Sequence, residues 1–189
     1  MTLFEKTIKG ILDGSIQPEK KNIYFLLDQI FSGESALAIL PLIRSENSKV
    51  AHSAAYLLSE INPNKHPEID DVLSAVISTN DDTIKSYIVD HIYFYKNYND
   101  SFTNFLISMV FSDDDVAGKR AIKCLHEIYK NSPSRLRGAI STSDEINEYL
   151  SRLPRSSIPR AIYYLSKKVS ISAKERRIAS LLRLICKLP

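Results

Sequence analysis

The chain of 189 residues is 44% hydrophobic and 25% charged and has only 5 glycines, so a globular protein with a substantial core is expected, whereas glycine-rich phosphate loops and tight β-hairpins are not. The net charge of +3 hides an asymmetry: residues 1–132 carry 13 Lys and Arg against 18 Asp and Glu, and residues 133–189 carry 12 against 4. We therefore expect an acidic body and a basic C-terminal segment, a field that steers charged partners towards or away from each end.

Two helices are expected first, at residues 3–13 and 18–31, with Pro18 in the first turn of the second. A repeat then begins, because the apolar pattern of residues 39–43 returns at 73–77 and again at 107–111, with an offset of 34 both times. Each copy continues through a short polar or acidic turn into a second helix. The apolar stripes of these second helices are Val50, Ala54, Ala55 and Leu58, then Ile84, Ile88, Val89 and Ile92, then Ala117, Ala121, Ile122 and Leu125.

Each repeat is therefore expected to be a helical hairpin. The small residues Ala54 and Ala55 allow two helix axes to come close together. A single hairpin cannot bury its apolar stripe alone, so neighbouring hairpins must stack.

Beyond the third copy, Pro133 and Gly138 interrupt the pattern. Thr142 and Glu145 have the spacing of a capping box before a short helix at residues 144–152. The basic C-terminal helices therefore follow a break in the repeat.

Pro154 is expected to end that short helix, and Pro159 to begin another. Ser172 and Glu175 form a second capping-box pattern, which opens the last helix at residues 173–187. No stretch shows the sustained alternation of a β-strand, so the protein is expected to be all-α.

The pattern V-A-x-x-A-A-x-x-L at residues 50–58, after a short polar turn, resembles HEAT and armadillo repeats, and the resemblance covers roughly residues 34–130. The signature residues of tetratricopeptide and ankyrin repeats are absent. The resemblance implies one domain over residues 1–189, an α-solenoid built as a right-handed stack of about nine to eleven helices in hairpins, with residues 133–189 as its basic C-terminal helices. Such a fold implies no chemistry by itself.

Known catalytic motifs are missing: the sequence contains no HExxH, GxSxG, GxxxxGK[ST] or GxGxxG. His91 occupies the repeat position of Leu57 and Cys124 and is expected to be a packed core residue. The acidic turns at residues 81–82 and 113–115 are expected to cap helices rather than to bind a metal. We therefore expect neither an enzyme nor a metal or other cofactor.

The N-terminal stretch MTLFEKTIKGILDG lacks the apolar core of a signal peptide, and the longest apolar runs, such as residues 105–111, are too short to cross a bilayer. Cys124 and Cys186 lack CxxC spacing and are expected to be reduced, partly buried thiols. These features favour the cytoplasm, although few cysteines do not exclude a secreted protein.

A partner-binding surface is predicted on the second helices, which line the concave face in solenoids of the class that this chain resembles. Aromatic residues beside carboxylates are typical of protein-binding surfaces. The alternative is that Tyr87 and Phe94 only pack against an adjacent helix. The candidate residues are His52, Tyr56, Glu60, Tyr87, Asp90, Phe94 and Tyr98.

The basic C-terminal segment has two interpretations. Its side chains could follow a phosphate backbone, with stacking from Tyr163 and Tyr164, or they could form the solvated face of terminal helices. The candidate nucleic-acid-binding residues are Arg152, Arg155, Arg160, Lys167, Lys168, Arg176 and Arg177.

The leading hypothesis is a protein-binding α-solenoid that is monomeric when free. More specifically, the chain resembles the immunity proteins of contact-dependent growth inhibition, some of which have HEAT-like folds and neutralise a toxin nuclease domain. An acidic body would suit a basic toxin domain. The alternative is a HEAT-like nucleic-acid-binding protein or DNA glycosylase that uses the basic helices, and a scaffold or chaperone for a cofactor-bearing protein is a third interpretation.

Overall fold

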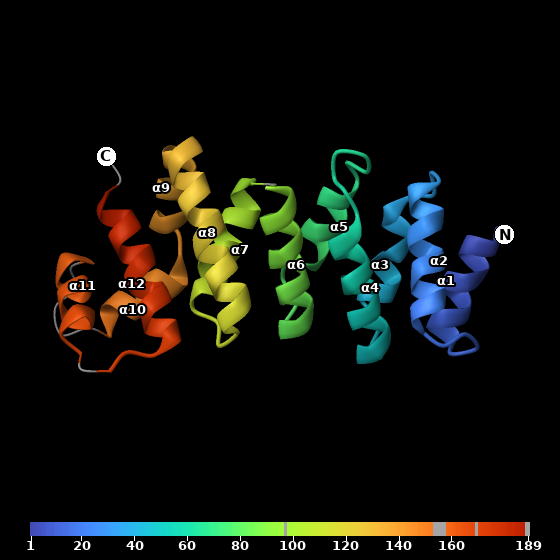
Figure 1. The fold of residues 1–189 in the computed structure, drawn as a ribbon, viewed down its shortest axis with the longest axis horizontal. Helices are drawn as coiled ribbons and strands as arrows, with labels where there is room; N and C mark the ends of the chain where they lie inside the picture. The colour runs from blue at the N-terminus through green and yellow to red at the C-terminus, as the bar shows by residue number, and fades with distance from the viewer. Residues whose placement is uncertain (97, 153–157, 169, 188–189) are drawn as a thin grey trace. The chain divides into compact units, whose positions relative to one another are not determined.

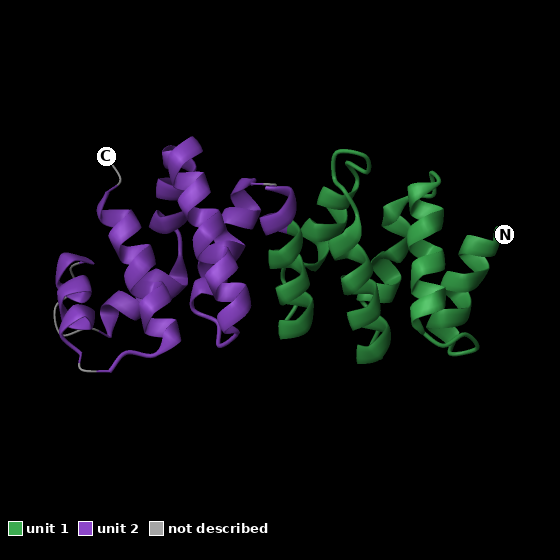
Figure 2. Ribbon diagram, in the orientation of Figure 1, with its two compact units in different colours: residues 1–91 green, residues 92–189 purple. Residues whose placement is uncertain are grey.

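The computed structural model describes residues 1–96, 98–152, 158–168 and 170–187, and all of the regular structure among them is helical. The prediction of an all-α protein is confirmed for this part of the chain. The chain divides into two compact units, residues 1–91 (unit 1) and residues 92–189 (unit 2) (Figure 2). The single domain and the right-handed stack expected from the sequence stay predictions.

Unit 1 consists of short helices. It contains α1 (Leu3–Asp13), α2 (Lys20–Phe31), the 3₁₀ helix η1 (Ala36–Ile39), α3 (Leu40–Ile43), α4 (Ser48–Glu60), α5 (Ile69–Val76) and most of α6 (Asp82–Tyr95) (Figure 1). The leading pair is confirmed, but α2 begins two residues later than predicted. Pro18 precedes the N-cap, Glu19, rather than lying in the first turn.

The predicted apolar stripe of α4 forms part of the core of unit 1. Val50, Ala54, Ala55 and Leu58 are all buried, and α4 packs against both α2 and α3. Small side chains at residues 54 and 55 leave room for this close packing. The equivalent residues of α6 within the unit, Ile84, Ile88 and Val89, are buried as well.

Unit 2 is built around a longer hairpin. It contains the end of α6, then α7 (Asp100–Val110), α8 (Asp115–Asn131), α9 (Pro133–Ser141), α10 (Asp144–Ser151), α11 (Ile158–Lys167) and α12 (Ala173–Cys186) (Figure 1). Helices α7 and α8 pack together, and α12 lies against α8, α7 and α11. The apolar stripe of α12 therefore closes the core of the unit rather than facing solvent.

The described chain has twelve α-helices and one 3₁₀ helix, which exceeds the predicted nine to eleven. The helix that was missed is α9. Pro133 occupies its first turn, where a proline loses no hydrogen bond, instead of interrupting the chain. Gly138 lies within the same helix.

Helix ends in unit 2 confirm one predicted cap and correct another. Ser172 and Glu175 form the expected capping box of α12. For α10 the N-cap is Ser143 and not Thr142, since the Ser143 hydroxyl accepts the backbone N–H of Ile146. The predicted helix end at Pro154 lies outside the described residues.

Candidate functional site

Three tyrosines from three different helices meet on the surface of unit 1. The hydroxyls of Tyr24 on α2 and Tyr56 on α4 lie 3.1 Å apart, and their rings are edge to face, with centroids 6.4 Å apart. Tyr87 on α6 continues the contact, with its ring centroid 6.0 Å from that of Tyr56. We call these three residues the tyrosine row.

The tyrosine row arises because each helix turns its apolar stripe inward and leaves a tyrosine on the other side. Tyr56 and Tyr87 are 31 residues apart, one helical turn less than the 34-residue offset of the repeat. The two tyrosines are therefore not at equivalent repeat positions but about one turn apart along their helices. The long tyrosine side chain allows the rings to meet despite this displacement.

A groove of about 470 Å³ runs beside the tyrosine row. Besides the three tyrosines, it is lined by Pro18, Lys20, Ile23, His52 and Ser53. The Lys20 ammonium lies 5.4 Å from the centre of the Tyr24 ring, a cation–π distance. Rings, one aliphatic side chain and a few polar groups give the groove the mixed character of a recognition surface.

The Tyr56 hydroxyl is neutral at physiological pH. The hydrogen bond with Tyr24 raises the pKa of Tyr56 to about 12, and partial burial and the charge of Glu60 act in the same direction. The Tyr56 hydroxyl therefore presents a hydrogen-bond donor and acceptor to a partner rather than a charge or a nucleophile.

His52 and Asp81 form a pair at the edge of this groove. His52 Nε2 lies 2.8 Å from Asp81 Oδ2, while Asp81 Oδ1 accepts the backbone N–H groups of Thr83 and Ile84. Partial burial raises the pKa of the Asp81 carboxyl, but the hydrogen bonds from His52, Ile84 and Thr83 outweigh burial and hold that pKa below its ordinary value. Asp81 caps α6, as predicted, and also orients His52.

The geometry of this pair does not make a catalytic triad. Ser53 also lines the groove, but it follows His52 directly in α4, so the two side chains do not face each other. A Ser–His–Asp mechanism needs the hydroxyl within hydrogen-bond reach of the imidazole.

The other predicted partner-binding residues do not line the groove beside the tyrosine row. Glu60 is exposed at the end of α4 and Asp90 is half-buried on α6, and neither lines the groove. Phe94 and Tyr98 belong to unit 2. Of the seven candidates, the structure brings together His52, Tyr56 and Tyr87.

Phe94 and Tyr98 line a second groove, of about 520 Å³, within unit 2. Its remaining lining residues are Tyr93, Lys96, Lys123, Cys124, His126 and Glu127. Burial raises the pKa of the Tyr98 hydroxyl, which is hydrogen-bonded to Cys124, and raises that of the Cys124 thiol to about 11. Both thiols are free and Cys124 is buried as expected, whereas Cys186 is exposed, so the expected burial is wrong for Cys186.

The basic residues of the C-terminal helices are not equivalent. Arg152 pairs with Glu148, and Lys168 with Glu175. Arg177 is only 5% exposed, so it does not present its charge to a nucleic acid. Exposed basic side chains are found at Arg160, Lys167 and Arg176, and Arg155 lies outside the described residues.

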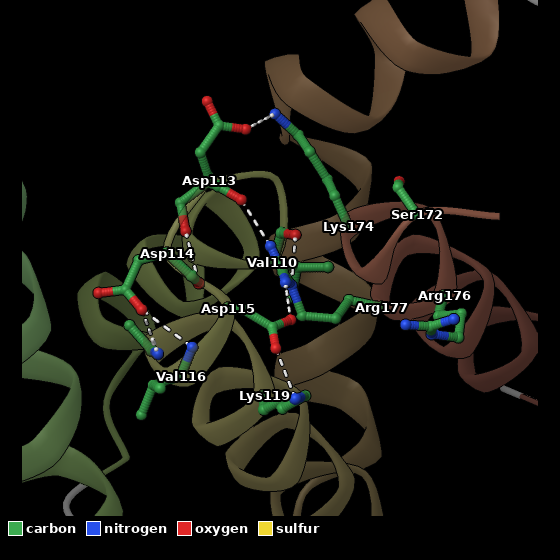
Figure 3. A network of polar contacts seen from close by, with 12 residues as sticks. Val110, Asp113, Asp114, Asp115, Val116, Lys119, Ser172, Lys174, Arg176 and Arg177 are labelled. Atoms are coloured by element: carbon green, nitrogen blue, oxygen red, sulfur yellow. Dashed lines mark hydrogen bonds and ion pairs between the residues drawn. The ribbon is translucent and has the colours of Figure 1, made fainter.

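Arg177 instead ties α12 to the start of α8 (Figure 3). Its guanidinium donates to Asp115 at 2.5 Å and to the carbonyls of Ser112 and Val110 at 2.5 Å and 3.4 Å. The next two carboxylates upstream are also engaged, Asp113 by Lys174 and Asp114 by the first amides of α8. The acidic turn therefore caps α8, which confirms its predicted capping role. It also links α8 to α12 through ion pairs.

Sequence reasoning missed Tyr24 and Lys20, because the leading helices stand outside the repeat that set the register. The T-shaped contact of Tyr93 with Phe94, and the cations above both rings, were missed as well. The apolar stripes that begin at Ile84 and at Ala117 make Arg120 equivalent to Tyr87, and this register predicts a position on the surface side of α8. It did not show which rings it would meet.

Comparisons with family models, with curated proteins and with solved structures find no match. The resemblance to HEAT and armadillo repeats therefore rests on the sequence pattern. In the described part of the chain no three or more His, Cys, Asp or Glu side chains are grouped so that they could hold a metal ion. Nor does that part contain a helix of the length and apolarity needed to cross a membrane.

Proposed function

We propose that this chain is a non-catalytic binding protein that recognises another protein through the tyrosine row and the groove beside it. The observation that carries the proposal is the contact of Tyr24, Tyr56 and Tyr87 across three helices at the surface of unit 1. Tyrosine is enriched at protein interfaces because it offers a large, rigid apolar area together with a polar end. Mutual contact fixes the rings in advance, which lowers the entropy cost of binding.

The charge of unit 1 supports a basic partner. Unit 1 has 8 Lys and Arg against 13 Asp and Glu, whereas unit 2 has 17 against 9. Asp113 and Asp115, which the sequence counted with the acidic body, are neutralised by Lys174 and Arg177. The acidic surface offered to a partner is therefore that of unit 1.

The narrower form of the proposal is an immunity protein that binds a toxin, a nuclease domain for example, and covers its active site. Its support is the sequence resemblance to HEAT-like immunity proteins of contact-dependent growth inhibition, together with the acidic charge of unit 1. A protein with this role needs no cofactor, works in the cytoplasm and is monomeric when free.

Affinity capture from the native lysate with matched variants tests the proposal. The wild-type chain is expected to capture one protein in stoichiometric amount, and Tyr56→Ala combined with Tyr87→Ala should lower its recovery about tenfold or more, as loss of interface hot spots does. Tyr163→Ala is the matched control, since this tyrosine is 65% exposed but lies on α11 of unit 2.

The identity of the captured protein decides the narrower form. A small basic nuclease whose activity the purified chain inhibits would support immunity. Recovery that is unchanged in the double tyrosine variant would remove this face from consideration. Nucleic acid that copurifies without any protein partner and is released by salt would instead support the alternative function.

A further inference from the structure

An exposed aromatic pair lies at the start of unit 2. Phe94 at the end of α6 is 62% exposed, and its ring meets that of Tyr93 edge to face with centroids 5.4 Å apart. Both rings line the groove of about 520 Å³ that was described above. A ring as exposed as that of Phe94 adds little to the stability of the core, and its face is accessible for contact with a ligand.

Cations from α8 surround this pair. The Arg120 guanidinium lies 5.5 Å from the centre of the Phe94 ring and 5.9 Å from that of Tyr93, and the Lys123 ammonium lies 5.6 Å from the Tyr93 ring. Arg120 and Lys123 are three residues apart, so they project from the same face of the helix. Lys123 also lines the groove, together with Lys96.

Planar rings beside cations are the elements that bind single-stranded nucleic acid. Bases stack on aromatic side chains and on guanidinium planes, while Lys and Arg hold the phosphates. In a duplex the faces of the bases are covered by their neighbours, so a stacking surface selects single strands. An acidic polypeptide would use the cations but has no series of flat rings for Phe94.

The charge of the whole unit agrees with a polyanionic ligand. Unit 2 has 17 Lys and Arg against 9 Asp and Glu. The same chemistry occurs a second time in this unit, where Lys167 lies 5.6 Å from the centre of the exposed Tyr163 ring. Ion pairs neutralise Arg152, Lys168 and Arg177, so the positive charge of unit 2 is not spread evenly over its basic residues.

We infer that Tyr93, Phe94, Arg120 and Lys123 form a binding surface for single-stranded nucleic acid, with a base against Phe94 and phosphates on Arg120 and Lys123. This surface lies in unit 2 and is independent of the protein-binding role proposed for the tyrosine row. It also assigns Phe94 to a different ligand from Tyr56 and Tyr87, although all three were predicted as one set.

Fluorescence anisotropy with a labelled oligothymidylate of about twelve nucleotides, a typical length for such sites, tests the inference on the full chain. Phe94→Ala is expected to lower the affinity by about tenfold or more, the usual effect of losing one stacked base. Lys123→Gln should reduce the slope of log K against log salt by about 0.7, the value for one phosphate contact to a single strand.

Matched controls separate the surface from general charge and from folding. Phe31→Ala removes a 53% exposed aromatic ring from unit 1 and should leave oligonucleotide affinity unchanged. Lys130→Gln removes a cation of α8 that is paired with Glu127, and should not change the salt slope. Thermal unfolding of each variant checks that the fold is retained.

Four results would overturn the inference: no binding by the wild-type chain at low salt, undiminished binding by a folded Phe94→Ala variant, equal affinity for the duplex of the same length, or equal affinity for polyglutamate. The double variant Tyr56→Ala and Tyr87→Ala should keep full oligonucleotide affinity. A loss there would contradict the independence of the two surfaces, whatever the fate of the proposed protein partner.

Discussion

Gly118 on α8 is the residue at which the absence of a side chain decides how two helices pack. A Cβ atom built there would lie 2.3 Å from Nε of Arg177, closer than real Cβ contacts allow. The guanidinium occupies that space because it reaches Asp115 at the start of α8 and the carbonyls of Val110 at the end of α7 and of Ser112 in the turn between them (Figure 3). At this helical position glycine is needed because the Arg177 side chain lies where a Cβ atom would be, and not because the backbone requires its conformational freedom.

Gly118→Ala is expected to destabilise the chain by about 2–4 kcal/mol, because it displaces a buried, ion-paired guanidinium. Gly138→Ala is the matched control, since nothing lies within 4 Å of that position in α9 and alanine is the better helix former. That control should stabilise by about 0.5–1 kcal/mol. Urea unfolding measures both changes. A Gly118→Ala variant as stable as the wild-type chain would contradict the contact.

His91 on α6 is a buried neutral side chain and makes stability depend on pH. Its Nε2 lies 3.0 Å from the Ile61 carbonyl, to which it donates. Burial lowers the pKa of His91, and the opposing effects of the Ile61 carbonyl and the Asp70 charge are smaller. The histidine of the unfolded chain, with a pKa of about 6.5, therefore binds a proton at a higher pH than His91 in the folded chain.

The stability contributed by neutral His91 is full above about pH 6.5 and is lost as the pH falls towards the lower pKa of the folded state. The free energy of unfolding should therefore fall between about pH 7.5 and pH 5.5, by at most about 1.4 kcal/mol per pH unit for one proton. Carboxyls with lowered pKa values, such as Asp81, titrate below this range. Denaturant titrations of the wild-type chain and His91→Leu measure the two slopes. A slope that persists in the variant would place the titrating group elsewhere.

At the scale of the helix, local signals predicted starts and apolar faces well. The capping box of Ser172 and Glu175 and the cap at Asp81 follow from interactions within one helical turn, so the sequence contains all that is needed. Pro133 was misread because proline both ends one helix and begins the next. Only the packing of α9 against α7 and α8 decides between these two roles.

The candidate site was less predictable than the helices that carry it. The 34-residue offset of the repeat makes Asp90 the equivalent of Tyr56, yet the rings that Tyr56 contacts in unit 1 are those of Tyr24 and Tyr87. Contacts between surface side chains depend on the length of these side chains and on how far neighbouring helices are shifted relative to each other. The constant spacing of the sequence repeat predicts neither quantity. Arg177 also could not be placed from the sequence. It belongs to a basic helix, but it is buried because it forms an ion pair with Asp115 on another helix.

The cap of α10 separates the sequence prediction from the structure in a direct experiment. Ser143→Ala should destabilise by about 1 kcal/mol, because it leaves the backbone N–H of Ile146 without its acceptor. Thr142→Ala should have a much smaller effect, since that hydroxyl donates to carbonyls at the end of α9 instead. Chemical denaturation compares the two variants. A larger loss in Thr142→Ala would restore the cap predicted from the sequence.

At the scale of the whole molecule, the net charge of +3 is the sum of two opposite contributions. Unit 1 has an excess of 5 acidic residues, and unit 2 an excess of 8 basic ones. A partner feels mainly charges within about 10 Å at 0.1 M salt, so the unit on which it docks determines the field that steers it. The isoelectric point of the chain therefore says little about its ligands.

The proposed protein partner should accordingly associate with a rate that falls as salt rises. Between about 50 and 500 mM salt we expect the association rate constant to drop by about tenfold or more, with the dissociation rate constant changing much less. Stopped-flow mixing measures both. Glu60→Lys combined with Asp82→Lys should flatten this dependence, because both carboxylates are exposed on unit 1. Arg160→Glu on α11 is the control in unit 2 and should leave the dependence on salt unchanged. An association rate that rises with salt would mean that the partner and the surface on which it docks carry charge of the same sign, and would contradict a basic partner docking on unit 1.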